Sequence, residues 1–423
     1  MNSALRQWIG GMALVCVFSG PAIAQPAAEP QPATPATPAV PATPATPATT
    51  PKPDAEGAEA APAERGAGPA AQALRADGAG SFSIRRGDYS MTLTGLVQIW
   101  GTPYLGSDAL VENDDPSTET GFRARRVRFG AYGGLPEHFN YRLYFELFDD
   151  VAASTVDGRP VGARLRDALI GWDRFEFANV VIGAGKVPFS RGNLTPTSEI
   201  ALPEDAFTIK RLGIDRRVGL SVSGAAGPLS YGAGIFNADP SLSFGNRADG
   251  LLGAGRVEFS TAAIGYSQST LGAAGGKPMG FSVGGGATLQ KNGAQEAWSA
   301  GGDLAFRHER VVATGELLYS KTKPLAVPVV PGGVPVEVPS LGGYFTLAVA
   351  VIPKLVEVAG RIEYFDANTK IDDENDLLLI SGGATTAFVD GRVKVGLQYQ
   401  SRGERHGRSL ANDAVLGQVL AQF

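Results

Sequence analysis

Between residues 122 and 150 the chain alternates between apolar and charged positions, with a short break at residues 134–138. A period of two predicts two β-strands whose two faces meet different surroundings. One face carries Val127, Phe129, Ala131, Tyr141, Leu143, Phe145 and Leu147. The other face carries Arg126, Arg128, Tyr132, Arg142, Tyr144 and Glu146. The apolar face is core in a soluble sandwich but meets lipid in an outer-membrane barrel, so this hairpin alone leaves both folds open.

The same alternation continues to the C-terminus, with no helical period of useful length. We expect strands at residues 89–101, 122–133, 139–148, 163–173, 175–186, 215–224, 229–237, 251–260, 281–290, 297–307, 311–319, 343–351, 355–365, 377–389, 392–400 and 413–423. These make about sixteen strands, and single-chain bacterial barrels have an even number.

The connections between these strands alternate in length. The long ones in the first half are 101–121, 149–162, 187–214 and 238–250. The short ones are 134–138, 174 and 225–228. Outer-membrane barrels alternate long outside loops with short periplasmic turns. This alternation continues to the C-terminus if residues 261–280, which are rich in Gly, form one irregular periplasmic connection. The chain then enters and leaves the barrel on the periplasmic side.

The N-terminal region predicts export from the cytoplasm. Residues 1–24 contain Arg6, an apolar run at 8–18 and an Ala-Ile-Ala sequence before Gln25, which indicate a cleaved signal peptide. The apolar run is too short to cross a membrane as a helix. Cys16, the single cysteine, follows Ala-Leu-Val and lacks the small residues of a lipoprotein signal.

Residues 25–80 are rich in Pro, Ala and Thr and cannot bury a core. We expect them to be disordered, and a periplasmic tether that contacts the cell wall is the alternative. Residues 81–423 are then the barrel domain. Its last strand places Val415, Val419 and Phe423 on one face, and a terminal aromatic residue resembles the assembly signal of outer-membrane proteins.

These features together predict an all-β protein, a transmembrane antiparallel β-barrel. Closure removes the sheet edges that a soluble fold with so many strands would have to protect. The predicted location is the outer membrane of a Gram-negative bacterium, in contact with its lipid.

Composition excludes several classes of function. The formal net charge of −5 argues against a nucleic-acid partner. His138 and His308 fall in predicted turns and His406 in a loop on the opposite side, so no catalytic triad is expected and the protein is not predicted to be an enzyme. The acidic run at 372–376 has calcium-binding residue types, as does 113–115, but solvated outer loops have the same composition. We therefore predict no metal site and no cofactor.

Parity along the strands assigns charged residues to the lumen. The early strands contribute Arg126, Arg128, Arg142, Lys186 and Arg217, with Glu146 as the main acid. The later strands contribute Asp303, Glu316, Glu357, Arg361 and Glu363, and the last wall adds Arg392 and Lys394. The predicted lumen is therefore basic on one side, with an opposing acidic wall of Asp303, Glu316, Glu357 and Glu363.

Four blocks of sequence resemble the phosphate-selective porins of the O and P type. They are FRARRVRFG at 122–130, LRDALIGW at 165–172, VIGAGKVPF at 181–189 and RRVGL at 216–220. The blocks keep the order of the family over about half of the barrel, although the family usually has an Arg-Asp pair where this chain has Arg216-Arg217.

The resemblance implies a homotrimer of water-filled barrels with about sixteen strands each. It also implies that the third outside loop, here residues 187–214 with Arg191, Lys210 and Arg211, folds inward and narrows the pore. The predicted function is passive diffusion of small solutes, with small anions such as phosphate preferred because a basic constriction concentrates them. A general non-selective porin and a structural barrel that tethers the envelope through residues 25–80 are the alternatives.

Overall fold

The structure is a computed structural model, and it describes residues 82–108, 120–149, 164–175, 177–240, 242, 245–262, 264–271, 279–325 and 336–423. The predicted signal peptide, the Pro/Ala/Thr-rich segment and the acidic run at 113–115 lie outside the described residues. The strands are β1 (Phe82–Arg86), β2 (Tyr89–Leu105), β3 (Gly121–Gly134), β4 (Phe139–Asp149), β5 (Arg164–Phe175), β6 (Ala178–Lys186), β7 (Arg216–Ala226), β8 (Leu229–Asn237), β9 (Gly250–Ser260), β10 (Gly280–Asn292), β11 (Gln295–His308), β12 (Val311–Pro324), β13 (Val338–Ile352), β14 (Val356–Asp366), β15 (Leu377–Phe388), β16 (Val393–Glu404) and β17 (Ala414–Gln422).

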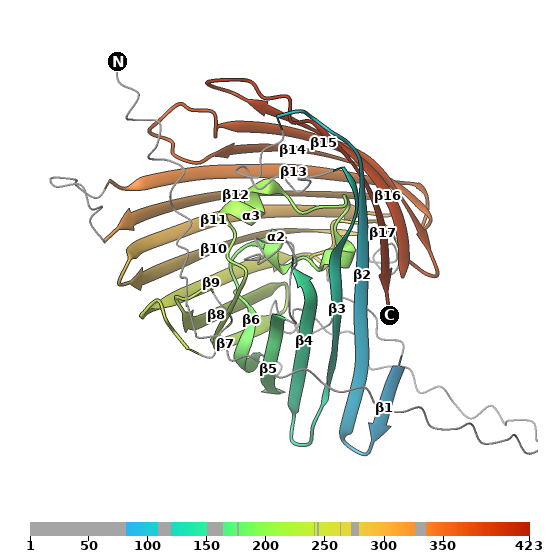
Figure 1. The fold of residues 1–423 in the computed structure, drawn as a ribbon. Helices are drawn as coiled ribbons and strands as arrows, with labels where there is room; N and C mark the ends of the chain where they lie inside the picture. The colour runs from blue at the N-terminus through green and yellow to red at the C-terminus, as the bar shows by residue number, and fades with distance from the viewer. Residues whose placement is uncertain are drawn as a thin grey trace, which may run out of the picture. The chain divides into compact units, whose positions relative to one another are not determined.

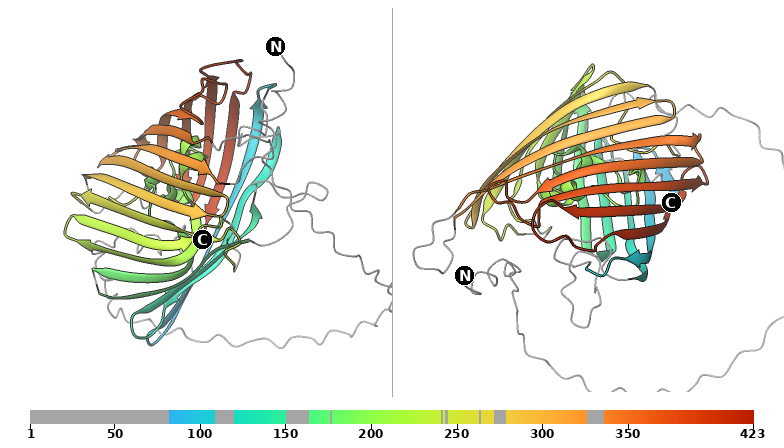
Figure 2. Two further views of the ribbon diagram at one scale, coloured as in Figure 1. Left: turned by 90° about the vertical axis from the view of Figure 1, so that its left-hand side faces the viewer. Right: turned by 90° about the horizontal axis from the view of Figure 1, so that it is seen from above.

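Strands β2 to β17 form a closed barrel (Figures 1 and 2). Each pairs antiparallel with the next along the chain, and β17 pairs with β2 to close the ring. The described part of the chain therefore contains the 16-stranded antiparallel barrel that the sequence predicts. The additional strand β1, which the sequence analysis did not predict, pairs with the first residues of β2.

The seam between the first and last barrel strands is held by the C-terminal residue. The Gly95 N–H donates to the Phe423 carbonyl at 2.7 Å, and the Phe423 N–H donates to the Gly95 carbonyl at 3.0 Å. A Cβ atom at Gly95 would lie 2.3 Å from the Phe423 ring. Glycine at position 95 thus leaves the room in which the terminal aromatic side chain packs against the seam.

The hairpin of β3 and β4 has its apolar face outward. Phe129 and Leu143 are 44% and 43% exposed, and the rings of Phe129 and Phe145 stack on this face. Arg126, Arg128 and Arg142 point inward and are buried. Exposed apolar side chains recur on β5 to β17, as expected of a surface that meets lipid.

The connections lie at two ends of the barrel. We call the end with 106–120, 150–163, 187–215, 238–249, 293–294, 325–337, 367–376 and 405–413 the loop end, and the other the turn end. The rhythm of long loops and short turns is confirmed except on either side of β10. There the loop-end connection is residues 293–294, while the turn-end connection is the long stretch 261–279. By the rule for outer-membrane barrels the loop end faces the outside.

Helical structure is confined to the connection between β6 and β7 in the described residues. It comprises α2 (Arg191–Leu194), the 3₁₀ turn η2 (Thr197–Glu199) and α3 (Phe207–Leu212). No helix in the described part of the chain is long and apolar enough to cross a membrane.

Candidate functional site

Residues 187–214 fold into the barrel, and we call them the inward loop (Figure 1). The side chain of Ser190 caps α2 by accepting a hydrogen bond from the Asn193 N–H. Helix α3 contacts β12, β13 and β14 on the far wall. The loop and wall share a buried apolar cluster of Val187, Phe189, Ala206, Ile209, Phe236, Leu252, Ala254, Leu318 and Tyr344. Apolar packing thus fixes the loop across the lumen, as the resemblance implies.

Glycines on the wall let the loop approach the backbone closely. A Cβ atom at Gly286 would lie 2.6 Å from the Phe189 carbonyl oxygen, and one at Gly342 would lie 2.8 Å from the Thr208 side chain. Gly286 and Gly342 therefore leave room for Phe189 and Thr208 of the inward loop to approach the wall.

Two acids of the predicted opposing wall bind this loop. Glu316 accepts hydrogen bonds from the backbone N–H groups of Arg191 and Gly192, both at 2.9 Å. Glu363 accepts one from the Thr208 N–H at 3.4 Å and another from Arg361 at 2.7 Å. These carboxylates anchor the constriction rather than face an open channel.

Arg191, which the sequence assigned to the anion pathway, also acts as an anchor. Its side chain is 1% exposed and lies 3.2 Å from Glu258 and 3.5 Å from Asp303. Asp303 in turn binds Arg256 at 2.5 Å. Arg191 therefore lies against the acidic wall. The buried carboxylates of Glu258 and Asp303 carry two negative charges, and Arg256 alone supplies only one positive charge.

A second segment enters the lumen from the turn end. Residues 264–271, which we call the turn-end segment, are buried apart from the half-buried Gly265. Glu357 on β14 accepts hydrogen bonds from the Ser269 hydroxyl at 3.1 Å and from the hydroxyl and N–H of Thr270. Arg307 on β11 donates to the carbonyls of Ser267 and Ser269 at 3.4 and 3.1 Å. The sequence predicted an irregular connection here but not its inward course.

The inward loop and the turn-end segment touch each other. The Thr195 hydroxyl donates to the Tyr266 carbonyl at 2.9 Å, and the Gln268 N–H donates to the Glu199 carbonyl at 3.0 Å. The guanidinium groups of Arg191 and Arg256 lie 5.1 and 5.7 Å from the centre of the Tyr266 ring. The lumen is consequently narrowed from both ends by segments that support one another.

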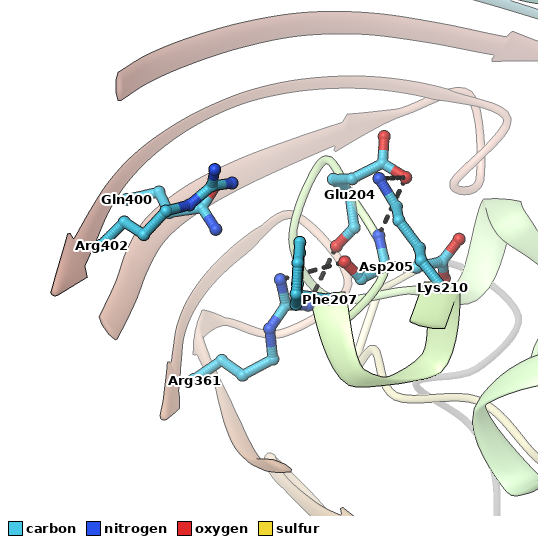
Figure 3. A pocket seen from close by; sticks show the side chains of 7 residues that line it. All are labelled: Glu204, Asp205, Phe207, Lys210, Arg361, Gln400 and Arg402. Carbon is cyan, nitrogen blue, oxygen red and sulfur yellow. Dashed lines mark hydrogen bonds and ion pairs between the residues drawn. The ribbon is translucent and has the colours of Figure 1, made fainter. Parts of the chain in front are cut away.

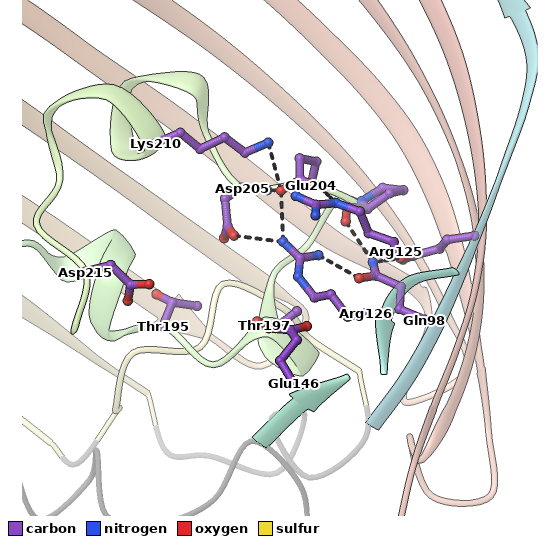
Figure 4. A network of polar contacts seen from close by, with 12 residues as sticks. Gln98, Arg125, Arg126, Glu146, Thr195, Thr197, Glu204, Asp205, Lys210 and Asp215 are labelled. Atoms are coloured by element: carbon purple, nitrogen blue, oxygen red, sulfur yellow. Dashed lines mark hydrogen bonds and ion pairs between the residues drawn. The ribbon is translucent and has the colours of Figure 1, made fainter. Parts of the chain in front are cut away.

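Basic side chains gather on the wall of β3 to β7, around few acids. Glu204 of the inward loop lies 3.1 Å from Arg125, 3.0 Å from Arg126 and 3.0 Å from Lys210 (Figure 4). Gln98 accepts a further hydrogen bond from Arg126 at 2.6 Å. One carboxylate is thus shared by three cations.

Two more acids on this side are shared in the same way. Glu146 binds Arg128 at 3.0 Å and Arg166 at 2.8 Å. Asp167 binds Arg142 at 3.0 Å and Arg216 at 2.6 Å. Asp215 is shared between the two groups, since it lies 3.6 Å from Arg166 and 3.1 Å from Arg216. Together the two groups hold four cations and three carboxylates, which leaves an excess of one positive charge.

Of the other predicted cations, Lys186 and Arg211 contact the inward loop, whereas Arg217 contacts its neighbour on β7. Lys186 donates to the carbonyls of Leu194 and Thr195, both at 3.2 Å. Arg217 donates to the Arg216 carbonyl at 2.9 Å. Arg211 is exposed and lies over the Phe207 ring.

A small pocket lies between α3 and the wall formed by β14 and β16 (Figure 3). It is lined by Glu204, Asp205, Phe207, Lys210, Arg361, Gln400 and Arg402. Arg361 donates to the carbonyls of Glu204 and Asp205 at 2.9 and 3.3 Å, so the wall also holds the loop at this point. Three cationic side chains, Lys210, Arg361 and Arg402, therefore line a pocket beside the inward loop.

Several residues of this site were missed from the sequence. Glu204 was missed because only the bases of the inward loop were considered, although Pro203-Glu204-Asp205 stands at its centre. Arg125 on β3 and Arg166 on β5 were missed because each strand contains a β-bulge, which changes the face on which the following residues lie. Apolar residues at lumen parity, such as Leu318 and Leu379, were the signal that something packs against the inner wall.

The charge of Glu204 should persist well below neutral pH. Its burial acts to raise its pKa, but the positive charges of Arg125, Arg126 and Lys210 outweigh burial and hold the pKa well below its ordinary value. An acid with a lowered folded-state pKa stabilises the fold above its ordinary pKa, and this contribution is lost only as pH falls through the lowered value. Glu204 itself should therefore cause no step in single-channel conductance between about pH 7 and about pH 5. A step in that interval that Glu204→Gln abolishes would contradict the assignment.

A closed barrel with an apolar outer face and a charged, constricted lumen defines an outer-membrane porin. Over residues 105–315 the chain matches the model of the family described as phosphate-selective porin O and P, and it belongs to that family. The resemblance seen in the sequence blocks is thereby confirmed. No curated protein sequence matches the chain.

Solved outer-membrane proteins share the fold at low sequence identity. The outer membrane channel DcaP of Acinetobacter baumannii matches with a TM-score of 0.53 and 13% identity, over 82% of this chain and 100% of that one. Salmonella typhi OmpF in complex with daunomycin matches with a TM-score of 0.53 and 11% identity, over 81% and 100%. The trimer form of Vibrio cholerae OmpT matches with a TM-score of 0.52 and 10% identity, over 79% and 99%.

Proposed function

We propose that this porin is a passive channel for small solutes that prefers small anions, of which phosphate is one. The observation that carries the proposal is the sharing of acids on the basic wall. Glu204 serves three cations, whereas Glu146 and Asp167 serve two each. A solute that passes the inward loop meets an excess of positive charge.

The acids of the far wall do not cancel this excess. Glu316, Glu357 and Glu363 accept hydrogen bonds from the inward loop or the turn-end segment. These carboxylates therefore contact the two segments and do not line an open pathway. In a narrow site with low dielectric constant, fixed cations raise the local concentration of anions. Guanidinium groups also match the paired oxygens of phosphate.

The test is the zero-current potential across a salt gradient in planar bilayers. The wild-type protein should give a potential of anion sign. Combining Lys210→Gln with Arg166→Gln should move it toward zero, because each change removes a cation from a carboxylate that keeps another partner. The matched control combines Lys323→Gln with Lys370→Gln, which removes two exposed cations outside the lumen and should leave the potential unchanged.

The same measurement separates the alternatives. A potential near zero that neither pair of substitutions alters would indicate a general non-selective porin, and a cation sign would refute the proposal. A barrel that never conducts would indicate a structural role. Block of chloride current by added inorganic phosphate would identify phosphate as the preferred anion.

The proposal includes a homotrimer, since the similar OmpT structure is described as a trimer form. Native mass spectrometry that finds only monomers would contradict this part. Contact of residues 25–80 with the cell wall stays a prediction.

A further inference from the structure

Two loop-end connections bring three side chains of metal-binding types together. Asp372 and Asp376 belong to the connection between β14 and β15, and His406 to the one between β16 and β17. His406 Nε2 lies 3.8 Å from Asp376 Oδ2 and 3.9 Å from Asp372 Oδ1. All three candidate ligand atoms lie within 4.8 Å of one another.

The spacing of these atoms suits a metal ion. In a near-equilateral triangle with sides of 3.8 to 4.8 Å, the centre lies about 2.2–2.8 Å from each corner. Zinc–nitrogen and zinc–oxygen bonds measure about 2.0–2.2 Å, so a small contraction of the exposed side chains would complete them. Asp372 and His406 are both exposed, and their side chains are free to make that adjustment.

A second observation comes from the buried partner, Asp376. This residue is only 3% exposed, and its Oδ1 atom accepts no hydrogen bond from the described residues. A buried carboxylate with an unsatisfied oxygen is unfavourable unless a hydrogen-bond donor or a cation compensates it.

The backbone holds the two connections in register for this contact. The Arg405 N–H donates to the Asp376 carbonyl at 2.8 Å, which places His406 beside Asp376. Gly407, at a φ of +74°, turns the second connection against Glu374. The sequence predicted the acidic run as a solvated loop, because nothing in the run showed that a histidine from another connection joins it.

We propose that Asp372, Asp376 and His406 bind a divalent transition-metal ion, of the Zn²⁺ type, at the loop end of the barrel. An imidazole nitrogen with two carboxylates is a donor set for Zn²⁺ and related ions, whereas Ca²⁺ prefers oxygen ligands alone. Solvent completes the coordination on the exposed side. The bound ion joins the two connections to each other, and this role is independent of the anion preference of the pore.

The test uses the tag-free, full-length protein, refolded in detergent and stripped of metal with a chelator. Co²⁺ is the probe, because its visible absorption changes when protein nitrogen and oxygen atoms replace water around the ion, and Zn²⁺ is then added as competitor. We expect saturable absorption that Zn²⁺ abolishes. His406→Ala and Asp376→Asn should each weaken Co²⁺ binding at least about tenfold.

The matched control combines His138→Ala with His308→Ala, which removes the two histidines at the turn end and should leave binding unchanged. Heat-modifiable migration on gels shows whether each variant has formed its barrel. The proposal is overturned if the wild-type protein gives no saturable signal. It is also overturned if folded His406→Ala binds as the wild type does, or if the control variant loses the signal instead.

Discussion

Glu204→Gln should raise the single-channel conductance several-fold. Glu204 is a carboxylate that Arg125 and Lys210 both contact, and its side chain is 3% exposed. Removing one partner of a buried ion pair costs about 3 kcal/mol or more, because the remaining charges stay buried. That corresponds to a shift of about a hundredfold in the equilibrium between a docked and a released inward loop. A released loop widens the pathway, and planar-bilayer recording measures the change.

Asp205→Asn is the matched control for this substitution. It removes the same formal charge one residue further along, but Asp205 is 26% exposed and lies 3.7 Å from Arg126. Both variants should therefore shift the zero-current potential further toward anions, whereas Glu204→Gln alone should change the conductance. Equal conductance in the two variants would show that Glu204 acts through its charge and does not anchor the loop.

The barrel could be predicted because membrane strands obey a strict local rule. Lipid on one side and water or charge on the other impose a period of two, which is visible in Phe129, Leu143 and Arg128 without any tertiary information. The connections could be predicted from the same constraint, since interruptions of the period mark the ends of strands. The strand β1 was not predicted because it is short: its alternation covers only Phe82 to Arg85, and all five of its residues are exposed.

The filling of the lumen could not be predicted in the same way. Whether a long connection runs outward or inward depends on partners distant in sequence, such as Glu316 for Arg191 or Glu357 for Thr270. In the sequence, acids on the later strands have the same appearance whether they face water or accept hydrogen bonds from a loop. In the structure Glu316 contacts the inward loop and Glu357 contacts the turn-end segment, and neither partner could be identified from the sequence.

Replacing residues 264–271 with a flexible Gly/Ser sequence of equal length should also raise the conductance several-fold. The replacement removes the side chains that bind Glu357, together with Tyr266, which lies beside Arg191 and Arg256. The barrel itself should still form, because the strand pairing between β9 and β10 is unchanged. The inward loop would lose its contacts with the turn-end segment but would keep its apolar contacts with the wall.

Glu357→Gln provides a finer version of this experiment. A glutamine keeps the volume but presents an amide donor to the Ser269 and Thr270 donors, which costs about 1–3 kcal/mol for each group left unsatisfied. Conductance should rise less than with the full replacement. Glu309→Gln, in an exposed turn at the same end, is the control and should have no effect. If the full replacement leaves the conductance unchanged, the turn-end segment does not obstruct the pathway and the inward loop alone sets the width of the pore.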